Sequence, residues 1–306
     1  MKANILKGIM LLMVISIAVA TAWILIDKPV GQYDKAARAM LDRLYHPQYQ
    51  IHASDKIDIK FDSSSKIGKD LYALNDISFH SPVLKHKLQA QQFKITRFDH
   101  KNKFPHFFTI KIRGLKIHRN TLPGGLLYLP FLQLRIKKIL ADATIMLDYN
   151  PSTKTLSLQM NILFRQLFKV HYQLKLKQFS ASLLEMIYAA SRRKRTNLEH
   201  EIDKSRLVFS SVKLSNTGFL QQAFKSMSPA MLNIITQNLN KRKSQARNNL
   251  MKQGTQALID FLQYKKSITI TIAPIIPIGI KEYALANNRQ KRKLLNTRIQ
   301  AEKPAL

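Results

Sequence analysis

The stretch of residues 141–177 reads ADATIMLDYNPSTKTLSLQMNILFRQLFKVHYQLKLK, and this stretch decides the fold. Apolar and polar residues alternate along it in three runs, separated by residues 150–154 and by Arg165–Gln166. Asn150 followed by Pro151 is typical of a turn, because Pro fixes φ and Asn bonds to its own backbone. The pattern predicts a three-strand antiparallel meander with one apolar face, on which Leu147 and Leu158 point into the core.

Further strand patterns lie on both sides of this meander. Alternation is strict in residues 56–61 and 108–113, and it is weaker around residues 74–79 and 93–95. Two more strands are predicted at residues 207–214 and 267–272. Pro274 and Pro277 confine the apolar residues between and after them to an edge or a loop.

A sheet with one apolar face needs a cover, and we expect C-terminal helices to supply it. Ser228 followed by Pro229 is typical of a helix N-cap with Pro at the first helical position. Helical spacing continues to Leu262, with a polar break expected between Lys241 and Asn249. The predicted fold class is therefore α+β, an antiparallel meander covered by C-terminal helices.

An uncharged apolar segment near the N-terminus begins at Gly8 and ends at Ile26. Its 19 residues would give a helix of about 28 Å, close to the hydrocarbon thickness of a bilayer. We expect one N-terminal transmembrane helix that stays attached. The alternative is a cleaved signal peptide, because Ala18-Val19-Ala20 offers small residues at the cleavage spacing.

The flanking charges bear on topology. Lys2 and Lys7 precede the segment and favour a cytoplasmic N-terminus, although Lys28 and Lys35 follow it and pull the other way. We expect an inner-membrane, single-pass protein with a periplasmic domain, or a soluble periplasmic protein after cleavage. The domain boundaries that follow are residues 1–28 for the anchor, 29–286 for a basic α+β domain and 287–306 for a basic tail, which is either a mobile end or a final weak strand.

The chain is strongly basic, with 50 Lys and Arg against 18 Asp and Glu and a formal net charge of +32. Self-repulsion at such a charge favours an anionic partner, and nucleic acid, an anionic membrane surface or an acidic glycan all fit. Nucleic acid is disfavoured, because no nucleic-acid-binding motif is present and a periplasmic domain rarely meets DNA. An anionic lipid or a lipopolysaccharide-like glycan fits the expected location better, and an envelope protein is a further possible partner.

No catalytic or cofactor motif is found. The chain contains no GxSxG, P-loop, GxGxxG or HExxH sequence, and it has no cysteine. We therefore expect no catalytic residue, no cofactor and no metal site.

Three dense basic runs are the candidate contacts for an anion or a lipid. Further cations, including Lys111, Arg113 and Lys169, occupy predicted strand positions. The ten candidates are Arg192, Arg193, Lys194, Arg195, Lys241, Arg242, Lys243, Lys291, Arg292 and Lys293.

A resemblance extends over residues 142–280. The turn sequence DYNPSTKTL at 148–156, a helical region after it and the SITI strand at 267–270 before Pro274 and Pro277 resemble uncharacterised bacterial envelope proteins with an N-terminal signal or anchor and an exported β-rich domain. The resemblance implies a Gram-negative envelope location, and it supplies no activity and no functional residue.

These observations together predict a non-enzymatic, membrane-anchored envelope protein that binds anionic lipid or glycan, or acts as an assembly component. The alternatives are an unrecognised hydrolase or transferase on envelope polymers and a cytoplasm-facing nucleic-acid-binding protein.

Overall fold

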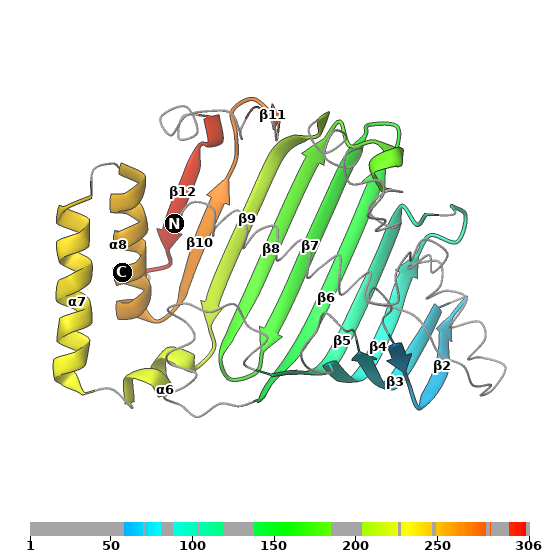
Figure 1. Ribbon diagram of the computed structural model, residues 1–306, viewed down its shortest axis with the longest axis horizontal. Coiled ribbons are helices and arrows are strands. Elements are labelled where there is room, and N and C mark those ends of the chain that lie inside the picture. The colour runs from blue at the N-terminus through cyan, green and yellow to red at the C-terminus, as the bar shows by residue number, and fades with distance from the viewer. Residues whose placement is uncertain are drawn as a thin grey trace.

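The computed structural model contains one large antiparallel sheet with helices at one end (Figure 1). The structure describes residues 58–69, 71–80, 88–102, 104–118, 138–184, 204–225, 228–246, 249–279, 282 and 294–303. The apolar segment at 8–26 and the basic runs at 192–195 and 291–293 lie outside the described residues. No helix among the described residues has the length and apolar character needed to span a bilayer.

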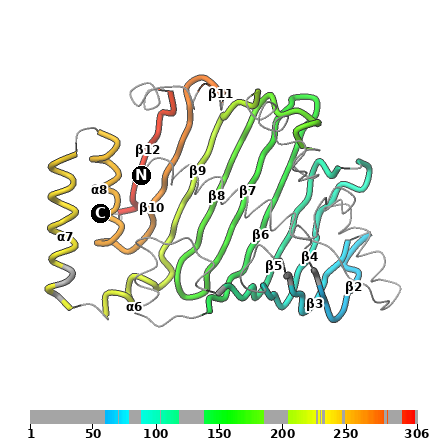
Figure 2. Tube along the Cα trace, viewed as in Figure 1, coloured from blue at the N-terminus to red at the C-terminus, as the bar shows by residue number. Residues whose placement is uncertain are grey.

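The strands follow one another through the sheet nearly in chain order. Their bounds are β1 Asp58–Lys60, β2 Ser63–Gly68, β3 Leu71–His80, β4 Leu88–Phe98, β5 Phe107–His118, β6 Lys138–Asn150, β7 Thr155–Phe164, β8 Phe168–Lys177, β9 Arg206–Asn216, β10 Ser267–Ile272, β11 Ile278–Gly279 and β12 Thr297–Ala301. Their order is β1-β3-β4-β5-β6-β7-β8-β9-β10-β12, with β2 beside β3 and β11 beside β9. Figure 2 shows the same path from β2 and β3 at one side of the sheet to β12 at the other.

The predicted meander is confirmed as β6, β7 and β8. Leu147 pairs with Leu158, and Leu158 pairs with Leu174 on the next strand. The turn also forms as expected, because the side-chain Oδ1 of Asn150 accepts hydrogen bonds from the backbone N–H of Ser152 at 3.0 Å and Thr153 at 3.1 Å. The alternating residues therefore fix both the strands and the way they pair.

One face of the sheet, here called the inner face, carries the apolar core. A row across it runs through Ile95, Ile110, Ile145, Met160 and Tyr172, all of them buried. The same row continues into β9 and β10, where Val212 is partly buried and Ile270 is 39% exposed. The inner face is thus well covered in the centre of the sheet and more open toward β10.

Two short elements close the ends of the central strands. At one end Phe179 packs edge-on against Tyr149, with ring centroids 5.7 Å apart, and leads into a helical turn at residues 181–184. At the other end Phe219 of α6 (Phe219–Lys225) packs edge-on against Phe168 at 6.1 Å. Each aromatic pair therefore ties a connecting segment to the end of a strand.

The main helices are α7 (Pro229–Ser244) and α8 (Asn249–Tyr264), and their expected start and break are confirmed. Their position corrects our expectation that they cover the meander. Helix α8 packs chiefly against β12 and β10, and α7 packs against α8 (Figure 1). Because only two residues join α8 to β10, the helix folds back onto the last strands and cannot reach over β6–β8 as its principal contact.

The sequence analysis left open whether the C-terminal residues form a mobile end or a final strand, and the structure contains a strand there. Residues 297–301 form β12, which pairs along its whole length with β10. This part of the chain belongs to the main sheet and is not a separate tail.

A candidate anion-binding face

The opposite face of the sheet, here called the outer face, carries basic side chains in register. Strands β4, β5, β6, β8, β9 and β12 all contribute to it, because every second residue of a strand points to the same side. The basic residues of this face are Lys94, Lys111, Arg113, Lys116, Lys138, Lys169, Lys175, Lys177, Lys213 and Arg298.

Lys94 and Lys111 lie directly opposite each other on β4 and β5. Like charges at directly opposed positions destabilise a sheet. Lys111 is exposed and Lys94 is half-buried, so the pair stands where an incoming anion could reach both ammonium groups. An anion that bound there would remove the repulsion between them.

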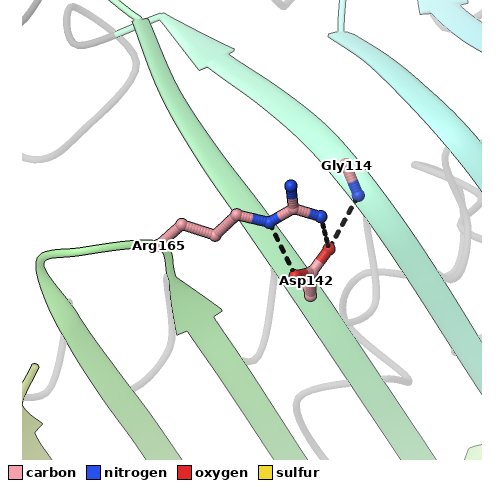
Figure 3. A network of polar contacts seen from close by, with 3 residues as sticks. All are labelled: Gly114, Asp142 and Arg165. Carbon is pink, nitrogen blue, oxygen red and sulfur yellow. Dashed lines mark hydrogen bonds and ion pairs between the residues drawn. The ribbon is translucent and has the colours of Figure 1, made fainter.

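The carboxylates on this part of the outer face are already paired. Asp142 accepts hydrogen bonds from Arg165 Nε at 2.9 Å, from Arg165 Nη2 at 2.8 Å and from the backbone N–H of Gly114 at 2.8 Å (Figure 3). The bonds from Arg165 hold the pKa of Asp142 below its usual value. Asp148 pairs with Arg97 at 2.7 Å. Neither carboxylate is therefore left to neutralise the lysines around it.

Gly114 is required at its position because the strand bulges there. Its φ is +64°, and β5 shifts register against β6 between Ile112 and Leu115. A Cβ at Gly114 would also lie 2.5 Å from Oε1 of Gln91. The bulge turns the N–H of Gly114 toward Asp142, which adds a third donor to that carboxylate.

The outer face is hollowed over β4–β8. The open hollow has a volume of about 350 Å³ and lies between the basic residues of β4 and β5 on one side and Lys169 of β8 on the other. Its polar and charged lining residues are Gln92, Lys94, Lys111, Arg113, Asp142, Thr144, Asn161 and Lys169. Lysine ammonium groups and an amide are donors that suit phosphate oxygens, so the hollow can hold a phosphate group.

His171 lies on the outer face between Asn161 of β7 and Lys213 of β9, and its pKa reflects the positive charge around it. Its Nδ1 donates a hydrogen bond of 2.6 Å to the Oδ1 of Asn161 on β7. Burial lowers the pKa of His171, and the charges of Lys169 and Lys213 lower it further. The imidazole therefore resists protonation in the field of the outer face.

Two leucines interrupt the basic surface. Leu140 is 41% exposed and lies opposite Lys116, and Leu163 is 38% exposed and lies opposite Lys169. A surface on which exposed apolar side chains lie among cations suits an anionic lipid surface, where the cations can meet headgroups and the apolar side chains can meet acyl chains.

Of the ten candidate residues from the sequence, the structure describes three, and these three lie on a helix and not on the outer face. Lys241, Arg242 and Lys243 form the last turn of α7, where the first two are exposed and the third is half-buried. Arg192–Arg195 and Lys291–Lys293 lie outside the described residues, as stated above. The described cations at predicted strand positions form the outer face together with three that the sequence analysis missed, Lys94, Lys213 and Arg298. Lys94 and Lys213 each sit between apolar neighbours in the sequence, a signal that could have identified them.

The titratable groups of the described core have structural explanations. Burial raises the pKa of Asp99, but hydrogen bonds from Asn102 and from backbone N–H groups outweigh it and hold the pKa below its usual value. These bonds organise the β4–β5 connection. Burial raises the pKa of Tyr172 to about 12, far from a useful range for proton transfer at neutral pH. Among the described residues no group of three or more His, Asp or Glu side chains is placed to hold a metal ion.

No protein-family model matches the chain, and no curated protein matches it significantly.

Proposed function

We propose that this chain is a non-enzymatic, membrane-anchored envelope protein whose outer face binds phosphate-bearing lipids. The observation that carries the proposal is the arrangement of the charges. Lysines and arginines from strands far apart in sequence share one face, while Asp142 and Asp148 on that face are paired with arginines. Lys213 pairs with Glu302 at 3.4 Å. Asp142 and Asp148 do not neutralise the other lysines of this face, so an external anion can do so.

Lipid is favoured over a purely polar polymer by the leucines of the outer face. Leu140 and Leu163 gain from burial in a lipid surface, whereas a phosphorylated glycan offers them no apolar contact. Each lysine or arginine close to an anionic membrane contributes about 1 kcal/mol, so several such residues bind without any specific pocket. Attachment through the N-terminal apolar segment would keep the domain close to the bilayer and raise the effective concentration of lipid.

Vesicle flotation tests the proposal. The chain lacking residues 1–28 is expected to bind vesicles that contain phosphatidylglycerol and to ignore phosphatidylcholine vesicles. Binding should weaken as salt rises, because the Debye length falls from about 8 Å at physiological ionic strength to about 3 Å at 1 M. Equal binding to both vesicle types, or none to either, contradicts the proposal and favours the assembly-component alternative.

Two additions separate the rival interpretations in the same assay. A soluble phosphorylated glycan without acyl chains should compete poorly with the vesicles at equal phosphate concentration, and strong competition would favour a glycan ligand. Replacing Arg192, Arg193, Lys194 and Arg195 with Gln tests the basic run indicated by the sequence, and it should weaken binding without unfolding the domain.

A further inference from the structure

The loop between β10 and β11 exposes two adjacent isoleucines. Ile275 is 84% exposed and Ile276 is 76% exposed, the highest values among the large hydrophobic residues that the structure describes. The next highest value belongs to Ile234 on α7, at 57%. Isolated exposed apolar residues are ordinary, but two neighbours at nearly full exposure on one loop are not.

The loop is held in place by its flanks. Pro274 and Pro277 stand on either side of the isoleucines and restrict the backbone. The carbonyl of Pro277 accepts a hydrogen bond from Arg206 Nη1 at 3.2 Å, and Ile278 is 3% exposed where it pairs with Leu207 of β9. The loop is therefore anchored at both ends, by the prolines and by the contacts of Pro277 and Ile278 with β9, and this keeps the isoleucines exposed.

Basic residues lie beside the β11 flank of this loop, and one of them, Arg206, also pairs with Glu282 at 3.6 Å. Arg206 lies opposite Gly279 of β11 on one side and opposite Lys177 of β8 on the other, and both Lys177 and Lys204 are exposed. The end of the sheet where β8 ends and β9 begins thus combines an apolar tip with cations, the combination found where proteins enter the headgroup region of a membrane.

We propose that Ile275 and Ile276 insert into the interfacial region of a lipid bilayer and set which end of the sheet meets it. The small size of the tip decides for lipid over a protein partner. A stable protein interface buries at least about 1,200 Å² with shape complementarity, which two side chains on one loop do not offer. A bilayer needs no complementary shape, and it accepts apolar side chains beneath a layer of anionic headgroups.

This insertion goes beyond the proposed function of the outer face, because it depends on apolar contact and the outer face depends on charge. Vesicles of neutral lipid therefore test the insertion of the isoleucines separately from the charge-dependent binding of the outer face. If the outer face does not bind anionic lipid, Ile275 and Ile276 should still enter a phosphatidylcholine bilayer. If the two isoleucines do not enter the bilayer, the outer face can still bind anionic lipid.

A single introduced tryptophan tests the insertion in the full chain. The chain has one tryptophan, Trp23, so Trp23→Phe gives a silent background for Ile276→Trp. The protein is reconstituted into phosphatidylcholine vesicles whose acyl chains carry bromine, which quenches tryptophan within the bilayer. Trp23→Phe with Ile234→Trp is the matched control, since Ile234 is exposed on α7, away from the loop.

The expected result is a blue-shifted emission and a large loss of fluorescence for Ile276→Trp, unchanged at high salt, with little loss for Ile234→Trp. Adding Ile275→Asp should restore most of the emission, because a carboxylate opposes entry into lipid. Emission from Ile276→Trp that remains unquenched, or equal quenching of both reporters, overturns the proposal. Circular dichroism of each variant confirms that the sheet is intact.

Discussion

Replacing Leu158 with Ala should strongly destabilise the sheet. Leu158 is 6% exposed at the centre of the meander, with Leu147 and Leu174 directly across on its two neighbours. Truncation of a buried Leu costs about 2–5 kcal/mol, through lost burial and the cavity left behind. Leu174 is buried but Leu147 is partly exposed, so the cavity is partly open and we expect a loss of about 3 kcal/mol in the free energy of unfolding.

Urea denaturation of the chain lacking residues 1–28, followed by circular dichroism, measures this loss. With an m-value of about 1–3 kcal/mol per M, the midpoint should fall by about 1–3 M. Gln159→Ala is the matched control on the outer face, and it should change the stability by less than about 0.5 kcal/mol. If Gln159→Ala cost as much as Leu158→Ala, the register of β7 would be wrong. Leu158→Asp should prevent stable folding, because it buries a charge without a partner.

The remaining predictions concern charge, pH and topology. Asp142→Asn should destabilise the protein by about 1 kcal/mol through loss of the two-point pair with Arg165, and Asp148→Asn should cost less because its pair is more exposed; equal midpoints in urea for both variants and the parent would contradict this. His171 should titrate by NMR below the ordinary histidine value of about 6.5, so the unfolded chain takes up the proton first and stability falls as pH drops from 6.5 toward the lower folded value. A pKa at or above the ordinary value would refute the positive field at this residue. Reporter fusions after Lys35 should be active only outside the cytoplasm; activity of a reporter that works only in the cytoplasm would reverse the topology, and loss of the first ~20 residues would indicate a signal peptide.

The sequence predicted those parts of the fold in which local pattern and tertiary burial agree. Strict alternation through Leu156, Leu158 and Met160 fixed β7 and its faces, because a shift by one residue would move every apolar side chain into water. Strand β2 was missed, since its sequence SSSKIG has no such alternation and its pairing with β3 holds it in the sheet. The position of α8 was also out of reach, because helical periodicity shows an apolar stripe and does not show which strands it meets.

The candidate site was only partly predictable, for a related reason. Dense runs such as Lys241–Lys243 stand out in a sequence, but the described basic face is assembled from residues as distant as Lys94 and Lys213. Single cations become neighbours only through the register of several strands, which includes the bulge at Gly114. The ion pair between Asp142 and Arg165 likewise depends on tertiary structure and could not be predicted from the sequence. Because Asp142 is paired with Arg165, it does not neutralise the lysines around it.

Binding to anionic vesicles by a variant of the outer face tests the central claim most directly. The triple variant Lys94→Gln, Lys111→Gln and Lys169→Gln removes three charges around the hollow, and Lys66→Gln, Lys225→Gln and Lys252→Gln removes three exposed charges from β2, α6 and α8. At about 1 kcal/mol for each lysine near the membrane, the first variant should bind phosphatidylglycerol vesicles about 100-fold more weakly, while the second keeps most of its affinity. Equal losses in the two variants would show that net charge alone drives binding, and would contradict the assignment of the outer face as the binding site.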